Sequence, residues 1–183
     1  MEHVMLDIET LGTGVNSVIL SIGACYFNPD TGDLGESFHV HVDAKSCCDH
    51  GLNVDISTVL WWLSQDSSSQ SKITDGQSKS IPLTDALNKL SQFISLHKET
   101  KVWGNGPTFD NAIIGNAYQS VNIKCPWEFR NERDVRTVVD LGRKVGFNPK
   151  YDMPFSGVRH DALDDAIHQA KYVSEIYKKI FSK

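Results

Sequence analysis

Residues 18–27, VILSIGACYF, form an almost uninterrupted apolar run that is rich in β-branched and aromatic side chains. A run of this kind is typical of a central strand that is buried on both faces of a sheet. Turn-forming residues bound it, with Gly12, Gly14 and Asn16 before it and NPDTG at residues 28–32 after it. We therefore expect residues 18–27 to be a central strand on which the rest of the chain packs.

Alternating segments lie on both sides of this run. In residues 4–9, VMLDIE, successive side chains point to opposite faces of a strand, so Asp7 and Glu9 share one face. Residues 38–42, FHVHV, alternate in the same way. Three consecutive strands joined by short turns predict an antiparallel meander.

The rest of the chain mixes helical segments with short extended ones. Either Asp55 or Ser57 is expected to cap a short helix, and the serine-rich residues 66–80 are expected to be mobile or partly helical. Pro82 is expected to begin a helix that buries Leu83, Ala86, Leu87, Leu90, Phe93 and Ile94.

The second half of the chain continues this alternation. A short strand is expected at residues 101–104, a brief extended piece at residues 127–129, and helices at residues 108–121 and 133–145, the latter ended by Gly146. A long C-terminal helix is expected to bury a face made of Ala166, Ala170, Val173, Ile176, Tyr177 and Ile180. The whole pattern predicts one α/β domain over residues 1–183, with a mixed sheet.

Composition narrows the class of protein. The chain has 183 residues, 40% of them hydrophobic, and no apolar run near the roughly 20 residues that a membrane helix needs. We expect a soluble, cytoplasmic protein whose four cysteines are reduced, because none of them has a CxxC spacing. A net charge of −5 argues against a protein that coats duplex DNA, but it permits an enzyme that meets phosphates through bound cations.

The stretch HDALDDA, residues 160–166, concentrates one histidine and three carboxylates at the expected start of the C-terminal helix. Like charges one helical turn apart repel. The positive end of the helix dipole explains one or two of the acids, but it does not explain His160. The alternative is half of a divalent-metal site.

Three further acidic residues, in two parts of the chain, also allow either a structural or a functional interpretation. Asp7 and Glu9 lie side by side on one strand, which indicates either a solvated sheet face or a pair held by a cation. Asp110 follows a strand end and the loop at residues 104–109, so it is either a favourable acid in a first helical turn or part of a site at a strand-to-helix junction.

Taken in order, these motifs resemble those of the DEDDh 3′–5′ exonucleases, which have a ribonuclease H-like fold. Further similarity is to the compact phage and bacterial branch, with phage T4 exonuclease A, the RNase AS group and exodeoxyribonuclease VIII-like proteins. It is carried by DIETLGT at residues 7–13, SIGACYFNPDTG at 21–32, WWLSQ at 61–65 and WGNGPTFDN at 103–111. The residues that match the family's catalytic positions are Asp7, Glu9, Asp110, His160 and Asp165.

The resemblance implies two Mg²⁺ or Mn²⁺ ions, which prefer carboxylate oxygens. Asp7 is expected to bridge both ions, Glu9 and Asp165 to complete the site nearer the attacking water, and Asp110 to serve the other ion. His160 is expected to be the general base.

Helix geometry does not decide which of the acids near His160 binds a metal ion. Asp161 and Asp165 share a helix face, and Asp164 lies about 100 degrees from Asp165. The family spacing of histidine plus five residues selects Asp165. We therefore interpret Asp161 and Asp164 as acids that favour the helix start.

Substrate contacts are expected from Thr10, Leu11, Trp61, Trp62 and Asn105. The resemblance implies that residues 10–11 touch the terminal nucleotide. Either tryptophan can stack on a base or pack in the core, and Asn105 either bonds the sugar-phosphate backbone or forms a turn. Five further histidines have no ligand spacing and are interpreted as structural or surface residues, namely His39, His41, His50, His97 and His168.

The expected function is therefore a two-metal 3′–5′ exonuclease that releases nucleoside 5′-monophosphates from single-stranded nucleic acid, with DNA slightly favoured over RNA. One alternative is an oligoribonuclease-like enzyme that acts on very short RNA. The other is a nucleic-acid-binding module without activity, which the five filled catalytic positions disfavour. The expected partner is a single-stranded 3′ end rather than a membrane, and a homodimer is compatible with the sequence.

Overall fold

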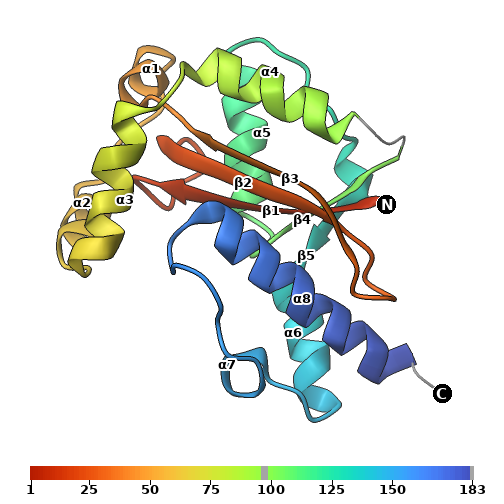
Figure 1. The fold of residues 1–183 in the computed structure, drawn as a ribbon. Coiled ribbons are helices and arrows are strands. Elements are labelled where there is room, and N and C mark those ends of the chain that lie inside the picture. Colours follow the sequence, from red (N-terminus) through yellow and green to blue (C-terminus); the bar gives the residue numbers. More distant parts are fainter. Residues whose placement is uncertain (96–98, 182–183) are drawn as a thin grey trace.

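The computed structural model describes residues 1–95 and 99–181, which fold around one five-stranded sheet (Figure 1). The strands are ordered β3-β2-β1-β4-β5 across the sheet. Strand β2 has all nine of its residues buried, as its apolar sequence predicts. The strand bounds are β1 His3–Thr10, β2 Ile19–Phe27, β3 Leu34–His41, β4 Lys101–Gly104 and β5 Glu132–Asp134.

The sheet is mixed, which confirms the fold class expected from the sequence. Strands β1, β2 and β3 pair antiparallel as a meander. Strand β4 pairs parallel with β1, and β5 pairs parallel with β4. In the ladder between β1 and β2, Asp7 lies directly opposite Gly23.

Helices cover both faces of the sheet (Figure 1). On one face, Val4, Leu6 and Ile8 of β1 pack in a core cluster with buried side chains of α4 and α5. On the other face, Met5 packs in a second cluster with α8. The helix bounds are α1 Ala44–Asp49, α2 Ile56–Leu63, α3 Ser67–Ser78, α4 Leu83–Ile94, α5 Asp110–Ser120, α6 Val135–Lys144, α7 Pro149–Asp152 and α8 Ala162–Phe181.

The brief extended piece expected at residues 127–129 includes Glu128, whose backbone is extended, but it ends at Phe129 and forms no strand. The Trp127 ring instead lies edge-on to Tyr118 of α5, and its Nε1 donates to Glu132 Oε1 over 3.1 Å. The chain then forms a single 3-10 turn, Phe129–Asn131, before β5 pairs with β4. The helix that follows begins at Val135 rather than at residue 133, because the Asp134 carboxylate accepts the N–H groups of the first turn.

Several other boundaries follow from local hydrogen bonds. Asp55, rather than Ser57, is the N-cap of α2. The serine-rich segment is a helix, α3, whose N-cap Asp66 accepts a hydrogen bond from the Ser69 N–H. The helix after Pro82 buries its expected stripe, although Phe93 is only partly buried. Gly146 follows α6 with a φ of 81°, which is the left-handed conformation common after a helix end.

The close approach of α8 to β2 positions the first turn of this helix. A Cβ atom placed on Gly23 would overlap the Ala162 carbonyl group and the Leu163 nitrogen. Only glycine therefore lets the helix start rest directly on the sheet. Because Gly23 lies beside Asp7, this contact brings the beginning of α8 to the acidic face of β1.

Two further expectations bear on the class of protein. Within residues 1–95 and 99–181, no helix has the length and apolarity that a membrane crossing requires. The four cysteines are free thiols, as expected, with Cys25 and Cys47 buried, Cys125 half-buried and Cys48 exposed.

Candidate active site

Four carboxylates and a histidine that are far apart in the sequence meet beside the end of β1. Asp7 and Glu9 come from β1, Asp110 from the first residue of α5 and Asp165 from the first turn of α8. His160 lies on the segment just before α8. Glu9, His160 and Asp165 each place one ligand atom within 4.8 Å of the others. The structure thus brings together all five residues that the sequence motifs indicate.

The surroundings of Asp7 shift the pKa of its carboxyl group strongly. Burial raises the pKa of its carboxyl group well above the ordinary value, and repulsion from Asp110, Glu9 and Asp165 raises the pKa further. One neighbouring group opposes this effect, because Gln169 Nε2 donates a hydrogen bond to Asp7 Oδ1 over 2.7 Å. Asp7 is therefore the meeting point of the three other carboxylates.

Asp110 is held beneath the site by backbone donors. Its side chain is almost fully buried and accepts the Asn105 N–H over 2.6 Å and the Ile8 N–H over 3.3 Å. Burial raises the pKa of Asp110 to about 6, although these N–H groups and the positive charge of Arg136 oppose the rise. The β4–α5 loop therefore fixes Asp110 against the end of β1.

Glu9 and Asp165 form the outer part of the acidic group. Burial, followed by repulsion from Asp165 and Asp110, raises the pKa of Glu9 to about 8. Burial also raises the pKa of Asp165, and its Oδ2 accepts the His160 N–H over 2.9 Å. Two acids that repel each other in a poorly solvated place favour a bound cation.

The donor set fits a hard divalent cation. Four carboxylates supply oxygen ligands, which Mg²⁺ and Mn²⁺ prefer over nitrogen or sulfur. Gln169 Oε1 is buried close to them and accepts no hydrogen bond from the described residues. Gln169 Oε1 can therefore accept a hydrogen bond from one of the water molecules that such ions retain.

Without divalent ions the folded protein should become less stable as pH rises, and bound divalent ions should reverse this loss of stability. In the unfolded chain carboxyl groups titrate near pH 4, whereas the folded pKa values reach about 6 for Asp110 and about 8 for Glu9. The folded protein then binds more protons than the unfolded chain, so its free energy of unfolding falls as pH rises through this interval. We expect the melting temperature in EDTA to fall by several degrees from pH 5 to pH 8, at about 2–4 °C per kcal/mol.

Thermal melts at several pH values test this expectation. Adding Mn²⁺ or Mg²⁺ should raise the melting temperature most at the alkaline end, because bound ions favour the ionised carboxylates. In the control measurement, a sodium salt in Ca²⁺-free buffer replaces the Mn²⁺ or Mg²⁺ salt at the same ionic strength. A melting temperature that ignores divalent ions at every pH would contradict a cation site here.

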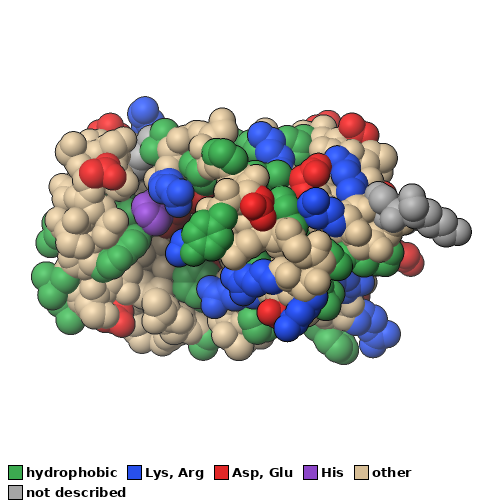
Figure 2. Space-filling model, turned by 90° about the horizontal axis from the view of Figure 1, so that it is seen from below, with side chains coloured by type: hydrophobic (Ala, Val, Ile, Leu, Met, Phe, Trp, Pro, Cys, Tyr) green, Lys and Arg blue, Asp and Glu red, His purple; other side chains and the backbone are tan. Residues whose placement is uncertain are grey.

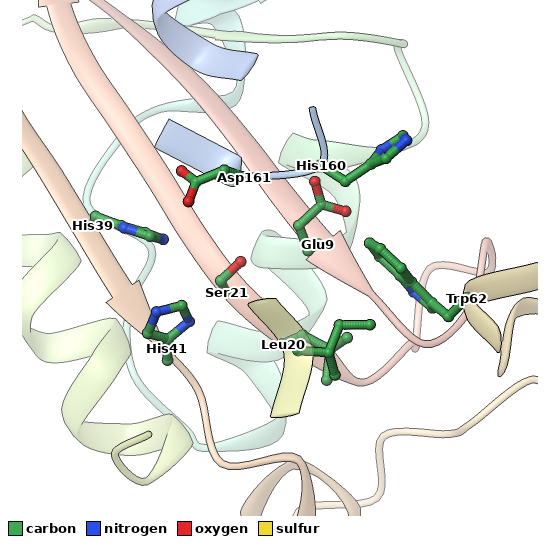
Figure 3. A pocket seen from close by; sticks show the side chains of 9 residues that line it. Glu9, Leu20, Ser21, His39, His41, Trp62, His160 and Asp161 are labelled. Atoms are coloured by element: carbon green, nitrogen blue, oxygen red, sulfur yellow. The ribbon is translucent and has the colours of Figure 1, made fainter. Parts of the chain in front are cut away.

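His160 adopts a backbone conformation that is uncommon for its residue type. Its φ is 61°, in the left-handed region, and such conformations cluster at functional sites. Its ring packs edge-on against Trp61 and Trp62, with centroid distances of 5.2 and 5.7 Å. Figure 3 shows Glu9 between His160 and Trp62 at one end of a small cavity, with His39 and His41 at the other end.

The two neighbouring tryptophans have different environments. Trp62 is buried, and its Nε1 donates to the Thr10 carbonyl oxygen over 2.9 Å, which ties α2 to β1. Trp61 keeps 44% of its surface exposed. Trp62 therefore positions α2, whereas Trp61 presents an aromatic face to the outside.

An open cavity of about 620 Å³, here called the catalytic cleft, lies over these residues. Its lining includes Asp7, Glu9, Thr10, Trp61, Trp62, Asn105, His160, Asp165 and Gln169. The cleft thus contains four of the five expected substrate contacts. Leu11 does not line it, because its side chain packs against the core and its peptide groups bond to Val18 and Asp55.

The remaining acids near His160 have structural partners. Asp161 Oδ1 accepts the N–H groups of Leu163 and Asp164, so Asp161 caps α8. Asp164 Oδ2 accepts the Val158 N–H over 2.8 Å and anchors the preceding loop. Both acids favour the start of the helix, as expected from the sequence.

The sequence motifs did not indicate Gln169. A glutamine four residues after Asp165 shares its helix face, and this spacing is the only signal that the sequence offers. Among the other histidines, His39 and His41 pack ring to ring and His168 packs between Phe155 and Tyr172. His50 is exposed, and His97 lies outside the described residues.

Comparison with known proteins gives a family for this arrangement. A sequence model of the 3′-5′ exoribonuclease Rv2179c-like domain matches residues 2–177. The chain belongs to this family. It is therefore a 3′–5′ exonuclease, as the sequence motifs indicated. The exodeoxyribonuclease of Enterobacteria phage T4 is 24% identical over 191 residues, which cover 88% of this chain and 82% of the phage protein.

Solved structures share the fold of the exonuclease at low sequence identity. The nuclease domain of 3′hExo, a DEDDh family member bound to rAMP, has a TM-score of 0.62 and 14% identity, covering 96% of this chain and 91% of that one. The zinc-bound complex of E. coli exonuclease I with single-stranded DNA has a TM-score of 0.72 and 14% identity. That likeness covers 99% of this chain but only 41% of exonuclease I, and the chain spans 62% of the nuclease CRN-4.

Proposed function

We propose that the protein is a two-metal exonuclease that removes nucleoside 5′-monophosphates, one at a time, from the 3′ end of single-stranded nucleic acid. The observation that carries this proposal is the convergence of five residues in one place. Asp7, Glu9, His160 and Asp165 line the catalytic cleft, and Asp110 lies buried beside them. This convergence also disfavours a binding module without activity, since binding alone does not require five such groups in one place.

The residues have distinct roles in the proposed reaction. Asp7, Glu9 and Asp165 would hold the ion nearer the attacking water, and Asp7 and Asp110 the second ion. Two bound Mg²⁺ or Mn²⁺ ions would supply a water of lowered pKa and positive charge for the phosphate oxygens. His160 takes the proton of the attacking water as general base, because imidazole changes its charge near neutral pH. The Asp165 carboxylate, bonded to the His160 N–H, fixes the backbone that carries this base.

The catalytic cleft favours a strand end over the middle of a duplex. Its volume of about 620 Å³ is that of a site for one small molecule, and its walls include Trp61, Trp62 and Phe109. A terminal nucleotide that is not stacked in a duplex can enter such a cleft. The E. coli exonuclease I complex with single-stranded DNA supports this substrate class.

The relatives support both kinds of sugar. The family description names an exoribonuclease, whereas the T4 relative is named an exodeoxyribonuclease. We propose that the protein cleaves both and slightly favours DNA, because the T4 relative matches over most of both chains. An oligoribonuclease-like activity on very short RNA is the second candidate.

Digestion of a 5′-labelled strand of about 20 nucleotides, as DNA and as RNA, tests the function. With Mn²⁺ we expect a descending ladder that disappears in EDTA and in the Asp165→Ala and His160→Ala variants. The exposed Asp75 of α3 offers a matched control, Asp75→Ala, which should retain the ladder. Cleavage of dinucleotides alone would favour the oligoribonuclease-like candidate, and no cleavage of any strand would contradict exonuclease action.

Trp61 is expected to contribute to substrate binding rather than to stability. Stacking of a base on an aromatic side chain is worth about 1–3 kcal/mol, so Trp61→Ala should raise KM by roughly tenfold or more. Its melting temperature should stay close to that of the wild type, because the side chain is partly exposed. Trp62→Phe is the comparison, since losing the hydrogen bond to Thr10 should lower the melting temperature. Equal KM values for Trp61→Ala and the wild type would contradict stacking.

A further inference from the structure

A second cavity, here called the basic cavity, opens beside the catalytic cleft. Its volume is about 640 Å³, within the range of ligand sites. Asn105, Asp165 and Gln169 line both cavities, so the two lie side by side. Figure 2 shows Lys and Arg side chains gathered around a hollow on the face of the molecule below the sheet. The cationic residues that line the basic cavity are Arg136, Arg143, Lys150 and Arg159.

The lining of this cavity carries more positive than negative charge, because Asp165 is the only carboxylate among the described residues that line it. None of the four side chains forms an ion pair within residues 1–95 and 99–181. Arg159 lies over the Phe155 ring at 5.1 Å, and Lys150 over the Tyr151 ring at 5.5 Å. Two nearby carboxylates, Asp152 and Asp164, accept backbone N–H groups. In a chain with a net charge of −5, this is a local excess of positive charge that attracts an anion.

The direction of the proposed reaction indicates which part of a strand lies there. In an in-line displacement the attacking water and the leaving oxygen lie on opposite sides of the phosphorus. The base, His160, lines the catalytic cleft but not the basic cavity. The leaving 3′-oxygen belongs to the next nucleotide upstream. It therefore lies away from His160, toward Asp110 and the Asn105 loop that opens into the basic cavity.

Arg136 lies beside Asn105, the residue of the β4–α5 loop that lines both cavities. Its Nε donates to Asn105 Oδ1 over 3.4 Å, and its positive charge lowers the pKa of Asp110. Beyond Arg136 the cavity offers Arg143 of α6 and Lys150 of α7, both exposed. Phosphates of successive nucleotides need cations at successive positions along the path, and these residues provide them.

We propose that the basic cavity binds the nucleotides immediately upstream of the scissile phosphate, with Arg136, Arg143 and Lys150 contacting their phosphates. The half-buried Phe155, with Arg159 over its ring, provides a surface for a base. This inference rests on the proposed exonuclease activity. It assigns the part of the substrate that sets the preference for a polynucleotide over a dinucleotide.

The test compares a substrate with upstream nucleotides and one without them. The first is the 5′-labelled strand of about 20 nucleotides, and the second is the p-nitrophenyl ester of thymidine 5′-monophosphate. The variant is Arg143→Gln with Lys150→Gln, which leaves Arg136 beside Asp110 untouched. The matched control is Lys45→Gln with Lys89→Gln, which removes two exposed cations on α1 and α4.

The ratio of the two kcat/KM values, strand over ester, is expected to fall about tenfold or more in the Arg143/Lys150 variant and to stay unchanged in the control. Binding of a fluorescent strand without divalent ions gives an independent measurement. Its dependence on salt should weaken by about 0.7 in log–log slope for each phosphate contact removed. Melting temperatures establish that both variants are folded.

The outcomes separate this inference from the function on which it rests. If the wild type cleaves neither substrate, the proposed exonuclease activity fails. If it cleaves both, but the Arg143/Lys150 variant keeps the wild-type ratio and salt slope, only the basic-cavity inference is overturned. A proportional loss on both substrates would also overturn it, because the residues would then act on the reacting phosphate or on the fold.

Discussion

Asp7→Asn is expected to lower kcat/KM by about 10³-fold or more and, in the absence of divalent ions, to stabilise the protein. Asp7 adjoins all three other carboxylates, so its loss should weaken both ion sites, where several kcal/mol of charge stabilisation are provided. The same position opposes folding, because burial and three neighbouring acids raise its pKa. A neutral asparagine removes that repulsion and still accepts the Gln169 hydrogen bond.

Two measurements on the same protein check this prediction. Single-turnover cleavage of the labelled strand with Mn²⁺ gives the loss of activity, and thermal melts in EDTA near pH 8 give the stability. At this pH the carboxylates of the wild type are most ionised and repel most strongly. Asp75→Asn, on the exposed surface of α3, should change neither quantity. If Asp7→Asn melted below the wild type in EDTA, Asp7 would be a structural residue and not primarily a metal ligand.

Opposite signs for activity and metal-free stability distinguish a metal ligand from a core residue. A core substitution lowers both quantities, since packing supports the site. A carboxylate among like charges lowers the stability of the folded protein unless a cation is bound. Glu9 and Asp165 share this behaviour, because burial raises the pKa of both.

The parts of the fold that could be predicted are those with strong local signals. Strand β2 is an apolar run between turns, and β4 and α4 have clear periodicity or a proline start. The three-residue β5 was not predicted, because only its pairing with the edge of β4 makes it a strand. Helices α1 and α7 were not predicted, since six and four residues are too few for a helical apolar pattern.

In the candidate site too, only the residues with a strong local signal could be predicted from the sequence. The motifs indicated Asp7, Glu9, Asp110, His160 and Asp165, because these residue types are unusual in their local contexts. Gln169 was missed, since a buried glutamine acts only through its contact with Asp7, 162 residues away in the sequence. The basic cavity was also missed, because its cations come from α6, α7 and the loop before α8 in an acidic chain. Such features depend on tertiary contacts that no local pattern encodes.

Gly23→Ala is expected to lower both stability and activity, although Gly23 lies outside the acidic group. The added Cβ atom would overlap the backbone of Ala162 and Leu163, and a backbone cannot move aside as a flexible side chain does. Overpacking of this kind costs about 1–3 kcal/mol, so the melting temperature should fall by roughly 2–12 °C. If the fold persists, the first turn of α8 must shift away from β2.

That shift should reduce activity far more than stability. Asp165 and the backbone of His160 are joined at the start of α8, whereas Asp7 and Glu9 stay on β1. A displacement of about 1 Å between catalytic groups costs roughly 10²-fold in rate. Gly115→Ala on α5 is the matched control, because nothing lies within 4 Å of the added Cβ and alanine favours a helix. A Gly23→Ala protein with wild-type activity would show that the contact between β2 and α8 does not set the geometry of the site. Asp165 would then be positioned against β1 by Gln169 and by the loop before α8 alone.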